Sequence, residues 1–445
     1  EDFYLHHKVS ASPEEAVALA VKSGTDLNCG NCYPKLIEAV EKGLISESEI
    51  DTSVKRLFKA RFLLGMFDPF DDVPFNKIPY EINNCQKHNE LALEAARKSI
   101  VLLKNDLILP LQKEKLKVLV VGPNADDIDV LLGNYNGTPL NPVTVLTGIK
   151  NKIGADNVCY EKGCNIAKSI LNFSPVPKGF FQTEDGESGL KGEYFNGSSA
   201  EGDPVYVTVD DSINFKWWAS SPDSLVSNDL FSARWTGYFV PKKSGRYSFM
   251  LKEQENSKFY FDDKEALHFW QKKNEFIVDL VENHKYPIRF EHNAYMRGSC
   301  VQLLWAQEDE NMESRAIEKA KDADVIIAVM GLTPRIEGEE MEIEIEGFHL
   351  GDRTDIELPT SQTEFLKKLK ATGKPIILVL LNGGAIALNW EHENIPAIIH
   401  AGYPGQRGGD AIADVIFGDY NPAGRLPVTY YKSISQLPPF DDYNM

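Results

Sequence analysis

The chain has 445 residues, of which 42% are hydrophobic and 25% are charged, so a disordered or fibrous protein is excluded and about three domains are expected. Its 47 basic residues stand against 66 acidic ones, for a formal charge of −19. Phosphate groups repel a chain this acidic, which excludes nucleic acid and anionic membranes as partners. No apolar run in the sequence is long enough to cross a bilayer.

The first 68 residues predict helices around one short strand. Ser12 with Glu15, and Ser46 with Glu49, form capping boxes that each begin a helix. Residues 25–29 between them predict a short buried strand. This order resembles the tail of a repeating βα unit, but a closed (β/α) barrel needs eight strands. Because the chain opens without Met or a signal-like segment, we expect it to be an internal portion of a longer protein.

Residues 69–90 have the proline-rich composition of a linker, and continuous apolar runs follow it. Such runs are typical of strands buried on both faces of a parallel sheet. They fall into two groups, in residues 91–176 and 307–445, which predicts one α/β sandwich split across the chain. The runs are residues 100–103, 117–123, 325–331, 376–381 and 397–400, and helices are predicted over 90–98, 361–372 and 408–417.

Residues 177–306, between the two groups, differ from them in composition and in hydrophobic pattern. They are rich in aromatic residues, Gly, Ser and Asp, and they alternate polar and apolar positions in short segments. Many short alternating strands predict an all-β sandwich inserted into the α/β domain.

The most unusual segment is residues 337–346, which hold six glutamates in ten positions without a basic residue. It begins just after the strand predicted at 325–331, where open α/β sheets place their ligand crevice. Crowded carboxylates raise the pKa of at least one of them, and a carboxylic acid that keeps its proton can act as a general acid. A solvated acidic loop and a weak calcium site remain alternatives.

The sequence has no complete zinc-binding, serine-nucleophile or nucleotide-binding motif. Cys29 and Cys32 form one C-x-x-C without further zinc ligands, which leaves a structural pair, a disulfide or a metal open. The sequence has no G-x-S-x-G, and the glycines of residues 381–384 and 405–409 match no nucleotide-binding loop. The sequence therefore implies no cofactor.

Several strings, in the same order along the chain, resemble glycoside hydrolase family 3. Residues 23–30 and 61–68 resemble the end of that family's barrel, and residues 96–105, 120–125 and 424–429 resemble its α/β sandwich domain. The resemblance implies an α/β fold in which residues 1–68 are the C-terminal part of a (β/α) barrel. Residues 189–195 and 235–237 resemble an inserted protective-antigen-type carbohydrate-binding sandwich, which in some members shapes the rim of the sugar pocket.

The resemblance also implies a retaining mechanism with an Asp nucleophile and a Glu acid/base. The acid/base maps most naturally to Glu337, because a Gly-Asp-Arg-Thr at residues 351–354 and a Leu-Pro at 358–359 follow it. Glu339 and Glu340 are alternatives, since the length of this loop varies. The nucleophile belongs to a Ser-Asp motif that this chain does not contain, and the substrate-binding residues stay unassigned.

We therefore expect a retaining exo-β-glycosidase that removes terminal sugars, and the favoured substrate is xylose at the end of xylo-oligosaccharides. β-Glucosidase is the alternative, arabinofuranosidase is a lesser one, and a catalytically silent carbohydrate-binding protein is the alternative from another class. The expected partners are an oligosaccharide and a complementary N-terminal barrel chain, with no metal or organic cofactor. Secretion or a periplasmic location is expected.

Overall fold

The computed structural model describes a chain that divides into two compact units, Glu1–His88 and Asn89–Met445. The described residues are 2–168, 170–171, 173–217, 220–228, 230–253, 257–268, 275–294, 299–307, 309–339, 341, 343–439 and 442. No helix in these ranges is both long and apolar enough to pass through a membrane.

The first unit is helical, and both predicted capping boxes begin a helix. The Ser12 hydroxyl accepts from the Glu15 amide at 3.2 Å, and Ser46 and Glu49 cap each other reciprocally. A small core, built on Val17, Val21 and Ala39, joins the helices. The helices are α1 (Asp2–Leu5), α2 (Pro13–Lys22), α3 (Leu36–Glu41) and α4 (Glu47–Leu63), with short 3₁₀ turns η1 (Tyr33–Lys35), η2 (Phe70–Asp72), η3 (Pro74–Lys77) and η4 (Tyr80–Ile82).

The strand predicted at residues 25–29 is wrong. Residues 25–28 have no regular secondary structure, and the Leu27 side chain is 72% exposed. A strand needs a neighbour for its backbone hydrogen bonds, and no other strand forms among the described residues of this unit. An apolar residue between polar ones is therefore not enough to make a strand here.

A six-stranded sheet organises the α/β part of the second unit, and it joins segments from both sides of the insertion. All neighbouring strands run parallel except the edge strand β1, which is antiparallel to β21. The split sheet predicted from the apolar runs is therefore confirmed, with an antiparallel edge. The strand order is β1 (Val101–Asn105), β21 (Ala397–His400), β20 (Ile376–Leu381), β16 (Val325–Gly331), β2 (Val118–Val121) and β3 (Val158–Glu161).

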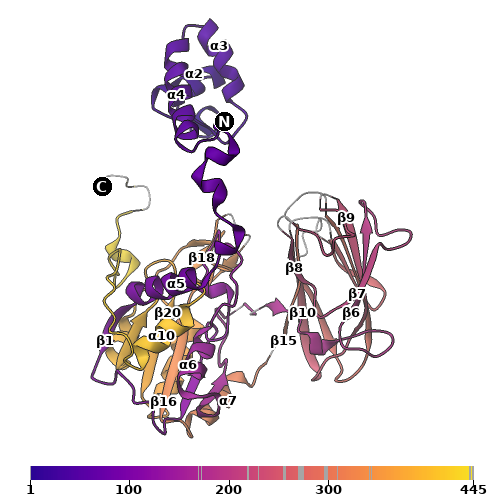
Figure 1. Cartoon of the computed structure of the whole chain (residues 1–445). Helices are drawn as coiled ribbons and strands as arrows, with labels where there is room; N and C mark the ends of the chain where they lie inside the picture. The colour runs from indigo at the N-terminus through magenta and orange to yellow at the C-terminus, as the bar shows by residue number, and fades with distance from the viewer. Residues whose placement is uncertain are drawn as a thin grey trace. The chain divides into compact units, whose positions relative to one another are not determined.

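Helices cover both faces of this sheet, which explains the continuous apolar runs. Val118 and Val120 of β2 face one core, while Leu119 and Val121 face the other. Figure 1 shows β16 and β20 in the middle of these layers. Helices α5 (Gln86–Ser99), α6 (Val145–Ile153) and α10 (Gly408–Ile416) contribute to the first core, and α7 (Met312–Ala320), α8 (Thr360–Lys370) and α9 (Asn389–Asn394) to the second. Short 3₁₀ turns are η5 (Asp129–Leu131), η6 (Ala155–Asn157) and η8 (Ile434–Gln436).

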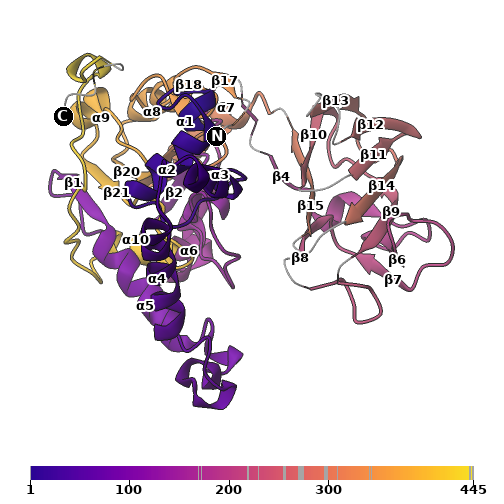
Figure 2. The ribbon, with the colours of Figure 1, turned by 90° about the horizontal axis from the view of Figure 1, so that it is seen from above.

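Between β3 and α7 the chain forms two antiparallel sheets around an aromatic core that includes Trp235, Tyr247 and Phe249 (Figure 2). The first and last strands of this sandwich, β4 and β15, pair with each other. One sheet contains β4 (Ser174–Pro175), β8 (Asn214–Trp217), β10 (Gly245–Glu253), β13 (Glu275–Leu280) and β15 (Ser299–Gln307). The other contains β5 (Phe181–Gln182), β6 (Leu190–Asn196), β7 (Tyr206–Asp210), β9 (Phe231–Phe239), β11 (Ser257–Phe261), β12 (Lys264–His268) and β14 (Tyr286–Ala294), and η7 (Lys178–Phe180) precedes β5.

The glutamate-rich segment leaves the carboxyl end of β16, the second strand in from β21. It folds back on itself as a small three-stranded sheet of β17 (Glu344–Ile345), β18 (Phe348–His349) and β19 (Asp352–Arg353). Because β16, β20 and β21 are parallel neighbours, the residues that follow each of them gather at the same edge.

Candidate active site

Glu337 lies six residues beyond the end of β16, in a turn that other segments hold in place. Its amide donates to the Thr333 carbonyl at 3.1 Å, and its carbonyl accepts from the Asn134 side chain at 2.7 Å. Two residues earlier, Arg335 forms ion pairs with Asp127 and Asp129. The backbone on both sides of Glu337 is therefore fixed, and its half-buried side chain has a defined direction.

The Glu337 carboxyl group contacts the residues that follow β20 and β21. The Tyr403 hydroxyl donates to Oε2 of Glu337 at 3.0 Å. A Cβ placed on Gly384 would lie 3.1 Å from Oε1, so the carboxyl group rests against a turn that a larger side chain would crowd. Sequence positions 337, 384 and 403 therefore meet at the carboxyl edge of the parallel strands.

Charged and phenolic groups surround this carboxyl group. Burial lowers the pKa of the Arg353 guanidinium, although the negative charge of Glu337 opposes that effect. Burial, with added contributions from the Glu337 charge and hydrogen bond, raises the pKa of Tyr403 well above its usual range. Tyr403 thus keeps its proton for hydrogen bonding, and Arg353 supplies a positive charge near the carboxyl group.

Arg353 comes from the Gly-Asp-Arg-Thr string, and the glycine of that string explains its position. Gly351 has a φ of +87°, and a Cβ there would lie 2.0 Å from the Gly338 carbonyl oxygen. Only glycine permits this close approach. The contact brings the start of β19 against the residue after Glu337.

The other described glutamates of the segment each have a different partner. The exposed Glu339 accepts from the Tyr135 hydroxyl, Glu344 pairs with His349 at 2.6 Å, and Glu346 accepts from Thr360 at 2.5 Å. Glu340 lies outside the described residues. Among the alternatives that the structure describes, Glu337 alone faces the tyrosine at the end of β21, and Glu339 points to another environment.

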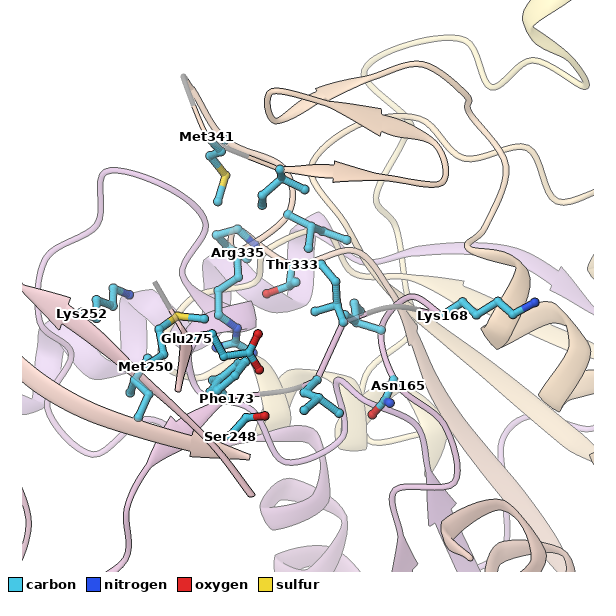
Figure 3. Close-up of a pocket in the computed structure, with 18 of the residues that line it drawn as sticks. Asn165, Lys168, Phe173, Ser248, Met250, Lys252, Glu275, Thr333, Arg335 and Met341 are labelled. Carbon is cyan, nitrogen blue, oxygen red and sulfur yellow. The ribbon is translucent and has the colours of Figure 1, made fainter. Parts of the chain in front are cut away.

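A cavity of about 1000 Å³ lies on the other side of this loop. Figure 3 shows Thr333, Arg335 and Met341 entering it from the loop, with Met250 and Glu275 from strands of the sandwich. Gly338 and Glu339 line the cavity, whereas Glu337 does not. The two candidate glutamates therefore face different spaces.

The arrangement supplies one oriented carboxyl group suited to proton transfer. Within the described ranges, no group of three His, Cys, Asp or Glu side chains could hold a metal ion, and the six cysteines are free thiols. The weak calcium site considered for the acidic segment has no such cluster among these residues.

Sequence reasoning missed Tyr403 and the turn at residues 382–384. The glycines of that turn match no nucleotide-binding pattern, and the sequence alone assigns them no other role. The available signal was positional, because both segments directly follow strands predicted to be parallel and buried. Residues after such strands share one edge of the sheet even when the sequence separates them widely.

Comparisons with known proteins show what the chain is similar to. Residues 100–445 match the model of the glycosyl hydrolase family 3 C-terminal domain. A xylan 1,4-beta-xylosidase from Xylanibacter ruminicola is 38% identical over all of this chain and 52% of its own length. A periplasmic beta-glucosidase from Salmonella typhimurium is 28% identical, over 98% of this chain and 41% of its own.

A solved structure shares the fold. The beta-glucosidase from Kluyveromyces marxianus in complex with glucose superimposes with a TM-score of 0.70, at 24% identity, over 94% of this chain and 52% of that protein. The chain thus spans about half the length, or less, of the relatives it matches.

Proposed function

Because this chain belongs to glycosyl hydrolase family 3, we propose that its protein is a retaining exo-β-glycosidase in which Glu337 is the acid/base. The observation that carries the assignment is the contact between the Glu337 carboxyl group and Tyr403 at the carboxyl edge of the parallel strands. Neither Glu339 nor any other described glutamate of the segment makes an equivalent contact.

In the proposed reaction Glu337 acts twice. As an acid it gives its proton to the glycosidic oxygen while an aspartate attacks the sugar carbon and the glycosidic bond breaks. As a base it then takes a proton from water, whose oxygen displaces the aspartate from the sugar. The aspartate is expected outside residues 1–445, in a barrel segment or a complementary chain, about 5–5.5 Å from Glu337 as retaining enzymes require.

For the substrate we propose terminal β-linked xylose on xylo-oligosaccharides. The similarity to a xylan 1,4-beta-xylosidase over the whole chain supports this choice. A β-glucosidase is the second candidate, and the lower similarity to a periplasmic beta-glucosidase favours it less. That same relative supports a location outside the cytoplasm, which cell fractionation would test.

The experiment compares Glu337→Gln, Glu339→Gln and Glu340→Gln in the full-length protein, with aryl β-xylosides and β-glucosides as substrates. Loss of a general acid slows substrates with poor leaving groups by about 10²–10⁴-fold. A dinitrophenyl leaving group needs no proton, so kcat/KM for its glycosides, which reports the first step alone, should change little in Glu337→Gln. Their kcat should fall, because Glu337 is also the base of the second step. Glu339→Gln is the matched control and should keep wild-type kinetics.

Three outcomes would contradict the proposal. Wild-type turnover in Glu337→Gln with a loss in Glu339→Gln or Glu340→Gln would move the acid/base role to that residue. Turnover of β-glucosides alone would favour the second substrate. A folded wild-type protein that binds oligosaccharide and hydrolyses no aryl glycoside would favour a catalytically silent carbohydrate-binding protein.

A further inference from the structure

Two glycines that are far apart in the sequence lie close to the ring of Tyr403, which is half-buried. A Cβ on Gly133 would lie 3.1 Å from Cδ2 of the ring, and a Cβ on Gly383 would lie 2.9 Å from Cε2. A larger residue at either glycine would crowd the ring, so the two glycines leave the space from which Tyr403 reaches Glu337.

The two oxygens of Glu337 have different surroundings. Oε2 accepts the hydrogen bond from Tyr403 at 3.0 Å. Oε1 lies against Gly384 and receives no hydrogen bond from the residues that the structure describes. Asn382 fixes that turn, because its amide nitrogen donates to the Gly384 carbonyl at 2.5 Å.

Tyr403 donates to Oε2 whether or not Glu337 carries a proton. The carbonyl oxygen of a neutral carboxylic acid accepts hydrogen bonds better than its hydroxyl oxygen does, so a tyrosine hydroxyl that donates to Oε2 favours the acidic proton on Oε1. Burial keeps Tyr403 protonated, so its hydroxyl keeps the proton that it donates to Oε2.

We propose that Tyr403 is the positioning residue that reserves Oε1 of Glu337 for the proton transferred in catalysis. This inference rests on the proposed function. In the first step the Oε1–H bond breaks and the proton moves to the departing glycosidic oxygen. In the second step a proton of the attacking water forms the Oε1–H bond again, so the carboxyl group ends as it began. Oε2 keeps its hydrogen bond from Tyr403 throughout.

Other groups also act on this carboxyl group. Arg353, from β19, places a positive charge near it. Burial raises the pKa of Tyr430, from the C-terminal segment, and the negative charge of Glu337 adds to that effect. His400, at the end of β21, lies edge-on to Tyr430 with 5.6 Å between ring centroids. Tyr403 differs from all three because it alone has a hydrogen bond to the carboxyl group among the described residues.

The test is Tyr403→Phe in the full-length protein, with kcat/KM measured on aryl glycosides with poor and good leaving groups. Because the proton is then divided between the two oxygens, kcat/KM for poor leaving groups should fall about tenfold. The value for dinitrophenyl glycosides, whose leaving group needs no proton, should stay within twofold.

Tyr135→Phe is the matched control, because Tyr135 donates to Glu339 instead. It should leave kcat/KM for poor leaving groups at the wild-type value, and circular dichroism should show both variants folded. A folded Tyr403→Phe variant with wild-type kcat/KM for poor leaving groups would overturn the inference. If Glu337→Gln retains wild-type turnover, the proposed function fails first. If Glu337→Gln behaves as an acid/base variant while Tyr403→Phe shows no loss, this inference alone fails.

Discussion

His292 makes the stability of the β-sandwich depend on pH. It lies in β14 with no exposed surface, close to the rings of Trp217 and Phe231, and its Nδ1 is 2.8 Å from the Ser257 hydroxyl. Burial lowers the pKa of His292 from 6.5 to about 4. Since the unfolded chain takes up this proton near pH 6.5 and the folded chain does not, acidification through this interval favours unfolding.

The size of the effect follows from the two pKa values. Each pH unit in which only the unfolded chain carries the proton lowers the free energy of unfolding by up to about 1.4 kcal/mol. Between pH 6.5 and about 4, His292 therefore removes about 3 kcal/mol of stability. That is a large fraction of the total for a domain of ordinary stability.

The assay is urea unfolding at several pH values between 7.5 and 4.5, followed by tryptophan fluorescence. The glutamine of His292→Gln stays neutral at every pH used. The free energy of unfolding should therefore fall more steeply with decreasing pH in the wild type than in this variant, even if the two proteins differ in stability at pH 7.5. His284→Gln, an exposed site on the same sandwich, should keep the wild-type slope. Equal slopes for wild type and His292→Gln would refute the reasoning.

Two further predictions concern the stability of the α/β domain. Gly148→Ala, in α6, places a Cβ 2.1 Å from the Gly409 carbonyl oxygen of α10. The clash should lower the free energy of unfolding by about 1–3 kcal/mol, which exceeds what alanine gains over glycine in helix propensity. Calorimetry should therefore show a lower Tm than for Gly137→Ala, where the added Cβ meets nothing within 4 Å. Arg97→Met removes a 2.7 Å charged hydrogen bond to the buried Asp414, and the urea midpoint should report a loss of about 2 kcal/mol. A loss no larger than that of Lys98→Met, which breaks the exposed pair with Glu94, would contradict this.

Most of the central sheet could be predicted from the sequence, because a strand that is buried on both faces is apolar at consecutive positions. Continuous apolar runs at 325–331 and 376–381 became β16 and β20, with every residue buried. The run at 100–103 also became a strand, β1, but it lies at an edge of the sheet and is mostly half-buried. Residues 25–29 failed because a strand depends on a partner that local pattern does not show.

The acidic segment could be located from the sequence, but the contacts of its glutamates could not be derived. Glu337 and Tyr403 are 66 residues apart, and their meeting depends on β16 and β21 lying on either side of β20. That order is a property of the folded sheet. The contact between Gly351 and Gly338 likewise depends on the backbone path of the hairpin, although the glycines themselves were visible.

The pairing of β4 with β15 bears on how the chain folds. β2 and β16 are neighbours in the central sheet although about 200 residues separate them, and bringing such distant segments together costs chain entropy. If the sandwich forms first, its first and last strands already lie side by side, and only about 75 residues remain in the open loop. The closure cost then falls by about 1 kcal/mol, which corresponds to about fivefold in the encounter of the two halves. The inserted domain therefore favours assembly of the sheet that it interrupts.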